Sequence, residues 1–317
     1  MKSNFSRLYS KTMLNLTHNE SVFTYSAETN SVVMIGLSYV LGTVFILINL
    51  PSVIIVLCSF CRRNDLKNMH VLFSLSITDM LFGFIWFLVI DINVNKNNIP
   101  YTECVVRLVI VQLSHLVSNV HLFNITLDRI CTVCLNAKLF INHRGAITIL
   151  TVIGSWIFSA GSLVLFQILN GRDSGEQECS ISRVMNPGFP YVATLLALIQ
   201  IGSISNVIVM IVFLIRHQNL MKATIRIDTG RKTSKSDIRL CVTVCIVSIV
   251  CTLLNLPWTV LLLYGSIVEW PSRFVLHSTF FLSSLTALVN PILYTYRTRK
   301  FRVLLQESTQ LLNCCRK

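Results

Sequence analysis

The chain has 317 residues, of which 53% are hydrophobic and only 13% are charged, and its mean hydropathy is +0.65. This is too little polar surface to cover a water-soluble globule of that size, so the composition excludes a soluble domain and predicts a membrane protein. The formal net charge of +13 is attributed mainly to basic residues on one membrane face, where they meet anionic lipid, and it implies no nucleic-acid partner.

Seven apolar segments of about 20 residues or more are spaced along the chain. We expect transmembrane helices at residues 32–60, 69–90, 104–134, 146–169, 189–215, 240–264 and 274–296. The predicted fold class is an all-α membrane protein, a seven-transmembrane helix bundle at 32–296. Residues 1–31 precede it as a tail with no apolar core, so they are not a cleavable signal peptide. Residues 297–317 are expected to form a short amphipathic eighth helix and a cytoplasmic tail.

Lysine and arginine are unequally divided between the two sets of connections. Of the 27, 19 fall in residues 61–70, 129–144 and 216–239 and in the C-terminal tail. The positive-inside rule places these segments in the cytosol and the amino end outside the cell. Asn4, Asn15 and Asn19 each begin an Asn-x-Ser/Thr acceptor, which agrees with a glycosylated extracellular tail on a plasma-membrane protein.

The cysteines divide in the same way. Of the 11, only Cys104 and Cys179 are expected to meet an oxidising compartment, so they are the natural disulfide pair. Cys314 and Cys315 follow a segment in which leucines and Phe301 recur at helical spacing beside basic residues. This pattern indicates an interfacial helix with palmitoylated cysteines, and an unmodified pair of tail thiols is the alternative.

Charged residues inside apolar segments mark candidate sites. Asp128 and Arg129 lie side by side at the inner end of the third span. A charge at membrane depth costs roughly 2.5–3.5 kcal/mol on insertion scales, so this pair indicates a functional site. Snorkelling of a helix end into the headgroups is the alternative. Asp79 is the one acid expected near mid-membrane, and it needs polar partners.

Further polar residues, aromatics and prolines occur along the spans in a recognisable order. They are Asn49, Leu75-Ser76-Ile77-Thr78-Asp79, Cys104 placed 25 residues before Arg129, Trp156, Pro257, and Asn290-Pro291-Ile292-Leu293-Tyr294. No single marker suffices, but the ordered set resembles the rhodopsin-like (class A) G-protein-coupled receptors. The resemblance covers residues 49–301 and implies a receptor with an extracellular ligand and a heterotrimeric G protein as partners.

The resemblance also implies a cytoplasmic switch. In that family the arginine is held at rest by its neighbouring acid and often by an acid twenty residues before the sixth-span proline, which here is Asp237. Outward movement of the sixth span about Pro257 would free Arg129 and open a cleft for the C-terminal helix of a Gα subunit. A solvated loop acid is the alternative for Asp237. Arrestin and receptor kinases are further expected partners. The expected switch residues are Asp128, Arg129, Asp237, Asn290, Pro291 and Tyr294.

The same resemblance places Asp79 in a hydrated sodium site. Ser118 and Asn290 stand at the positions that join the aspartate in that family, with Asn49 close by. Oxygen ligands suit such a hard cation. A hydrogen-bonded polar cluster without the ion is the alternative, and no other cofactor is expected.

Some positions depart from the family pattern. Asn255 replaces the tryptophan two residues before Pro257, and the fifth span lacks its internal proline and its lower tyrosine. An alternative function therefore stays open, namely a receptor-fold protein with weak or no coupling that acts as a dimer partner or decoy. An enzyme is not expected, because His115 and His121 are accompanied by no acid that would complete a metal site.

Residues at individual positions exclude some classes of ligand and favour others. Amine receptors carry an aspartate seven residues after Cys104, where Val111 stands, and opsins need a lysine in the seventh span, which has none. Arg107 suits a carboxylate or phosphate, so a peptide or an anionic small molecule is expected. Pairing of Arg107 with Glu103 or Asp91 is the alternative. The side chains expected to face the ligand are Arg107, Val111, Gln112, His115, Trp258, His277, Phe280 and Phe281.

Overall fold

The structure is a computed structural model, and it describes residues 35–54, 57, 70–94, 100–135, 137–169, 189–223, 235–268 and 273–297. Several predicted sites lie outside these ranges and stay predictions. They are the acceptor asparagines Asn4, Asn15 and Asn19, the tail cysteines Cys314 and Cys315, and Cys179. The tail boundaries at 1–31 and 297–317 are untested for the same reason.

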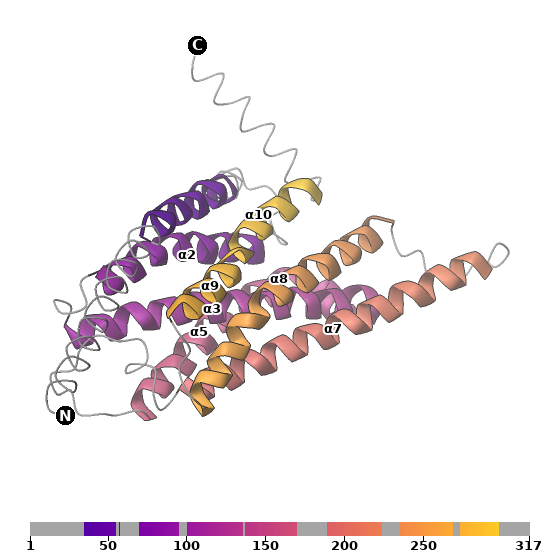
Figure 1. Cartoon of the computed structure of the whole chain (residues 1–317). Helices are drawn as coiled ribbons and strands as arrows, with labels where there is room; N and C mark the ends of the chain where they lie inside the picture. Colours follow the sequence, from indigo (N-terminus) through magenta and orange to yellow (C-terminus); the bar gives the residue numbers. More distant parts are fainter. Residues whose placement is uncertain are drawn as a thin grey trace, which may run out of the picture.

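Within the described ranges the chain is built from helices that run side by side (Figure 1). The long ones are a first helix at Ile35–Ile54, α2 (His70–Val94), α3 (Tyr101–Arg129), α5 (Arg144–Leu169), α7 (Phe189–Ala223), α8 (Lys235–Ile267), and the consecutive pair α9 (Arg273–Ser284) and α10 (Thr286–Arg297). A π-helical turn, η1 (Ile130–Cys134), and the short helix α4 (Lys138–Asn142) lead from α3 to α5. Each of the seven predicted spans therefore coincides with a helix or, for the last, with a helix pair.

The helices are apolar enough to cross a membrane. Six of them contain a described apolar stretch of sufficient length, and α2 adds a shorter one at Phe73–Leu88. Large apolar side chains such as Ile157 and Leu253 are exposed on the outside of the bundle. Helices satisfy their own backbone hydrogen bonds, and apolar side chains on their outer faces suit lipid rather than water. The predicted all-α membrane bundle is confirmed.

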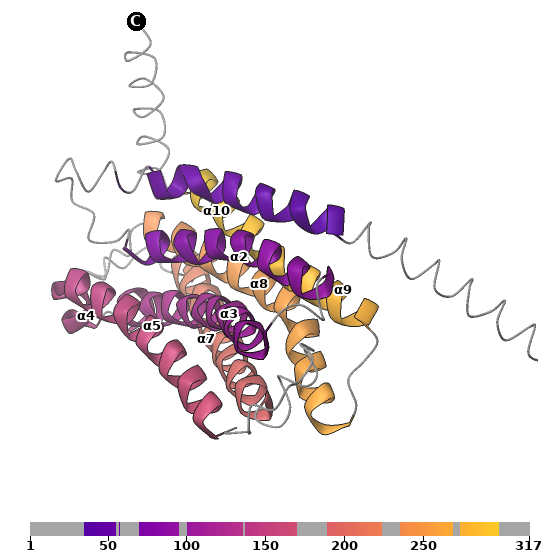
Figure 2. The same ribbon diagram turned by 90° about the vertical axis from the view of Figure 1, so that its left-hand side faces the viewer.

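α3 is the central helix. It contacts α2, α5, α7 and α8, which surround it in the view of Figure 2. This position explains why α3 carries so many buried polar side chains, since each can reach a neighbouring helix instead of lipid. Side chains of α3 therefore connect the sites described below.

The seventh span differs from its prediction, which was one helix over residues 274–296. It is interrupted at Leu285, whose backbone N–H reaches both Phe281 O and Leu282 O at 3.3 Å. The hydroxyls of Ser284 and Thr286 bond carbonyls three residues earlier, at 2.7 and 2.8 Å. Such side-chain bonds compete with the helical backbone pattern, which accounts for the break.

The inner end of α3 also differs, because the predicted span 104–134 does not stay α-helical to its end. Residues Ile130–Cys134 form the π-helical turn, with Leu135 N–H bonded to Ile130 O at 2.9 Å. The hydroxyl of Thr132 donates to Asp128 O at 2.6 Å and competes for that carbonyl. The irregular turn thus begins directly after Arg129, and single π turns of this kind are frequent at functional sites.

Candidate functional site

The inner site centres on an ion pair at the end of α3. Arg129 Nη2 lies 2.5 Å from Asp128 Oδ2, and the side chains of Arg129 and Asp128 are 13% and 28% exposed. Asp237 belongs to the first turn of α8, but its side chain lies outside what the structure describes. The second half of the predicted latch is therefore untested. Tyr294 is likewise placed on α10 without a described side chain.

Next to the ion pair, apolar side chains join η1, α7 and α8. This inner cluster consists of Ile130, Val207, Met210, Val244 and Cys245, all buried. Any outward movement of α8 must separate Val244 and Cys245 from the other three residues. The cluster therefore lies where the predicted switch requires the bundle to open.

Asp79 lies in the middle of the bundle and is 1% exposed. Asn290 Nδ2 donates to Asp79 Oδ2 at 3.0 Å, while Asp79 Oδ1 has no hydrogen-bond partner in the described part. Asn49 does not bond this carboxylate. Its amide donates to Phe45 O and Ala287 O, both at 3.0 Å, and so ties the first helix to α10.

A small cavity adjoins Asn290. Its volume is about 10 Å³, which is space for about one water-sized ligand. Its lining residues are Leu75, Ser118, Asn119, Leu122, Cys251, Asn255, Thr286 and Asn290. Two of the three predicted sodium ligands thus face one cavity, and the third is bonded to Asn290. The oxygen-rich donor set and the unpartnered carboxylate oxygen fit a hard cation.

Toward the other end of α3 lies an aromatic cluster formed by Phe82, Trp86, His115, Trp258 and Phe280. Ring centroids of Trp86 and Phe280 are 5.1 Å apart, and those of Trp258 and Phe280 are 5.2 Å apart. His115 meets Phe82 and Trp258 edge-on at 6.0 and 6.4 Å. The structure therefore brings together three of the predicted ligand contacts from α3, α8 and α9. The two α2 aromatics were not predicted, although large rings four residues apart were a signal.

Buried polar atoms without partners collect at this cluster. Within the described ranges they are Trp86 Nε1, Trp258 Nε1, His115 Nε2 and both amide atoms of Gln112. Gln112 lies one turn before His115 on α3 and is 4% exposed. An unsatisfied buried polar atom costs about 1–3 kcal/mol, so a group of them calls for a ligand or water.

The other predicted ligand contacts are not part of the aromatic cluster. Val111 is buried and Phe281 packs against the same apolar core, whereas His277 is half-buried. Arg107 Nε donates to Glu103 Oε1 at 3.1 Å, and its Nη1 donates to Leu88 O at 3.3 Å. Arg107 therefore makes the pairing named as the alternative, and its charge is compensated on its own helix.

Cys104, one turn before Arg107, is fully buried and disulfide-bonded. Its predicted partner, Cys179, is not among the described residues, so the pairing itself stays a prediction.

A chain of buried polar side chains runs between the aromatic cluster and the small cavity. We call it the polar chain, and it consists of His115, Ser283, Asn255 and Asn119. Ser283 Oγ donates to Asn255 Oδ1 at 2.6 Å, and Asn255 Nδ2 donates to Asn119 Oδ1 at 3.4 Å. In the sequence, Asn255 stood out only because the family has a tryptophan at this position. Its partners on α3 and α9 were not predicted, because their meeting depends on helix rotation.

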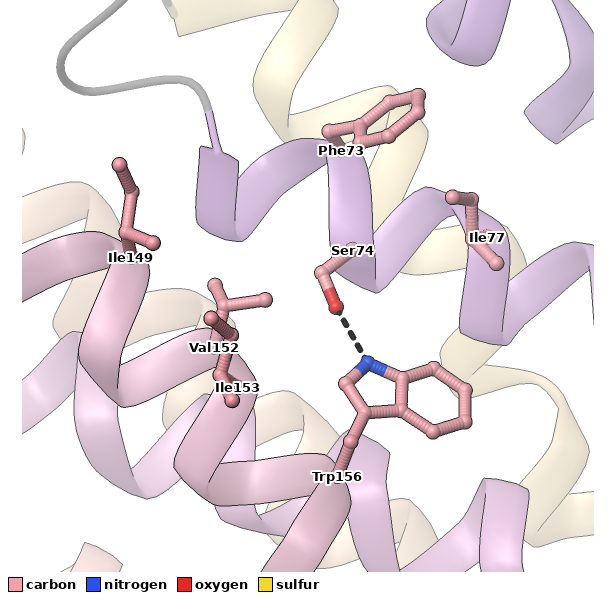
Figure 3. A pocket seen from close by; sticks show the side chains of 7 residues that line it. All are labelled: Phe73, Ser74, Ile77, Ile149, Val152, Ile153 and Trp156. Atoms are coloured by element: carbon pink, nitrogen blue, oxygen red, sulfur yellow. Dashed lines mark hydrogen bonds between the residues drawn. The ribbon is translucent and has the colours of Figure 1, made fainter.

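A larger groove of about 310 Å³ lies between α2 and α5 (Figure 3). It is apolar except for Ser74 and Trp156, and Trp156 Nε1 donates to Ser74 Oγ at 2.9 Å. Ser74 Oγ is also 2.7 Å from His121 Nε2. No predicted ligand or switch residue lines this groove. Trp156 therefore joins α5 to α2, Ser74 extends the contact to His121 on α3, and both residues belong to the framework of the bundle.

The comparisons with known proteins agree with this geometry. The model of a family described as 7 transmembrane receptor (rhodopsin family) matches residues 52–294, which is more than half of the chain. No curated protein matches the chain. Because the family match extends from the first helix to Tyr294 in α10, the chain belongs to the rhodopsin family of seven-transmembrane receptors.

Proposed function

We propose that the protein is a plasma-membrane receptor that binds an extracellular ligand and activates heterotrimeric G proteins. The observation that carries this proposal is the Asp128–Arg129 ion pair, which lies at the end of α3 predicted to be cytosolic and directly before a π-helical turn. A paired charge at this depth needs a reason, and a switch that exchanges partners supplies one.

The proposed movement is an outward swing of the inner half of α8. Pro257 lies inside α8 and removes one backbone hydrogen bond, which makes it a natural bending point. The swing would separate the inner cluster, free Arg129 and admit the C-terminal helix of a Gα subunit into the groove. Arrestin and receptor kinases are proposed to act on the same cytoplasmic face.

The proposed ligand site is the aromatic cluster with Gln112. The peptide or anionic small molecule expected from the sequence relied on Arg107, whose charge is now met by Glu103. The unpartnered atoms at the cluster are neutral donors and acceptors, and these favour a small molecule over a strongly charged ligand. At Asp79, Ser118 and Asn290 we propose a sodium ion, supported by the cavity and by the free carboxylate oxygen.

The function is tested by measuring G-protein activation without ligand in cells that express the wild type or Arg129→Ala. Basal activity is expected to be at least severalfold lower in Arg129→Ala than in the wild type, because Arg129 is the group that the swing releases. Arg216→Ala is the matched control, since this arginine is exposed at the inner end of α7. Equal signals from wild type and Arg129→Ala, at equal surface expression, would favour the non-coupling dimer partner or decoy, an alternative that rests on Asn255 and on the altered fifth span.

The latch is tested separately with Asp237→Ala. Loss of the acid should remove one restraint on Arg129 and raise basal activity. Arg239→Ala, an exposed change two residues along α8, is the control and should leave basal activity unchanged. Unchanged activity in Asp237→Ala would show that this acid is a solvated residue with no part in the switch.

A further inference from the structure

One hydrogen bond at the Asn119 end of the polar chain fixes the direction of donor and acceptor groups along the rest of it. Asn119 Nδ2 donates to the backbone oxygen of His115 at 2.9 Å. A carbonyl oxygen only accepts hydrogen bonds, so the amide nitrogen of Asn119 must lie on that side. The side-chain oxygen of Asn119 therefore faces the other way, toward Asn255.

The orientation of Asn119 on α3 determines the hydrogen-bond directions of Asn255 on α8 and Ser283 on α9. Asn119 Oδ1 only accepts, so the group 3.4 Å away on Asn255 must be Nδ2. Asn255 then presents Oδ1 to Ser283, whose hydroxyl lies 2.6 Å away. A serine hydroxyl has one proton, and this proton is committed to Asn255.

The last link sets the state of His115. Ser283 Oγ lies 3.4 Å from His115 Nδ1 and has no second proton to give, so it must accept there. His115 is 2% exposed, and its side-chain contacts in the described ranges are with neutral groups, so the imidazole is neutral. With the proton on Nδ1, Nε2 is a bare acceptor, and it has no partner among the described residues.

We propose that His115 Nε2 is the acceptor that recognises the ligand, and that the ligand is an uncharged molecule with a hydrogen-bond donor on an aromatic body. This inference deepens the proposed receptor function and rests on the ligand site assigned there. The rings of Phe82 and Trp258 flank His115 and suit an aromatic ligand. The unpartnered atoms of Gln112 and Trp258 offer further bonds to neutral groups.

Asn255 has a defined part in this arrangement. A tryptophan at this position offers one donor and no acceptor, whereas asparagine accepts from Ser283 and donates to Asn119 at the same time. Asn255 is thus a positioning residue, because it orients Ser283 and through it selects the tautomer of His115. Asn255, which departs from the family pattern, thereby keeps Nε2 of His115 unprotonated as an acceptor for the ligand.

The tautomer is measured by NMR on the full-length chain in nanodiscs with ¹⁵N-labelled histidine, with His115→Gln used to assign the signal. A protonated Nδ1 and a bare Nε2 are expected. Ser283→Ala removes the acceptor for Nδ1–H and should yield a mixture of tautomers. Ser203→Ala is the control, because this buried hydroxyl bonds Ile199 O on its own helix, away from the polar chain. A protonated Nε2 in the wild type would overturn the proposal.

The ligand class is measured on the wild-type protein with phenol and anisole. Both carry the same ring, but only phenol has an O–H donor. Phenol is expected to shift the Nε2 resonance of His115 with an apparent affinity about tenfold above that of anisole, the effect of one hydrogen bond. No shift with phenol, or equal shifts with both, would overturn the proposal. Neither measurement involves a G protein, so the outcome of both is independent of whether the signalling test succeeds or fails.

Discussion

The buried carboxylate of Asp79 has an incomplete set of hydrogen bonds among the described residues. Its carboxylate receives a single hydrogen bond, from Asn290, and its other oxygen is buried without a partner in the described part. A carboxylate with one bond is poorly compensated at this depth, since a buried charge needs both pairing and hydrogen bonds. A cation shared with Ser118 and Asn290 would supply what is missing.

Sodium is therefore expected to stabilise the folded wild type. When sodium replaces choline at about ten times its dissociation constant, linkage adds about 1.4 kcal/mol and raises the Tm of the purified protein. Asp79→Asn should abolish this sodium response. Ser114→Ala is the control and should keep it, because among the described residues that buried hydroxyl bonds Ile110 O on its own helix. A sodium response that survives in Asp79→Asn would exclude Asp79 as the ligand.

Ser74 is the residue on which two other polar groups depend. Its hydroxyl bonds both Trp156 Nε1 and His121 Nε2, so Ser74→Ala leaves two polar atoms unsatisfied. The free energy of unfolding should fall by about 2–4 kcal/mol. Ser162→Ala should change it by less than about 0.5 kcal/mol, because within the described part of the chain this hydroxyl bonds Phe158 O near the bundle surface. Thermal unfolding in detergent compares the two, and equal losses would contradict the framework role.

At the scale of elements, the apolar runs predicted the spans because lipid selects for helix length and composition. They did not predict that α7 continues to Ala223 or that α8 begins at Lys235, since polar residues extend a helix beyond the membrane at little cost. The break at Leu285 and the π-helical turn also escaped prediction. Both arise from hydroxyl groups that bond nearby carbonyls, and whether a serine or threonine does so depends on its rotamer.

The contact between the first helix and α2 depends on two glycines. A Cβ added to Gly42 would lie 2.8 Å from Gly83 O, and one added to Gly83 would lie 2.7 Å from Gly42 O. The helices approach closely because neither residue has a side chain.

Gly83→Ala should therefore force the first helix and α2 apart and lower the free energy of unfolding by about 1–3 kcal/mol. Gly154→Ala is the matched control, because nothing lies within 4 Å of its added Cβ. It should be neutral or stabilising by up to about 1 kcal/mol through helix propensity. The two variants are compared by thermal unfolding, and a neutral Gly83→Ala would mean that this helix pair is loosely packed.

On the scale of the whole molecule, polar contacts connect the aromatic cluster with the small cavity beside Asn290. The polar chain leads from His115 to Asn255 and Asn119, both of which line the small cavity beside Asn290. Motifs in the sequence pointed to Asp128, Arg129 and Asp79, because these positions follow the family spacing, and the switch itself stays a prediction. They could not predict the polar chain, whose members are ordinary polar residues until the helices are placed against one another.

Opening at the inner end should be visible in the thiols of α8. Cys245 is 5% exposed within the inner cluster, whereas Cys251 is 3% exposed and lies deeper, with its sulfur 3.6 Å from Asn290 Oδ1. If α8 swings about Pro257, Asp237→Ala should increase the rate at which N-ethylmaleimide labels Cys245 several times over, because the labelling rate follows the population of the open state. Cys251 lies closer to the bending point and should keep its rate, which mass spectrometry of the separate peptides can resolve. Raised basal signalling without faster labelling of Cys245 would mean that the receptor activates by a movement other than separation of the inner cluster.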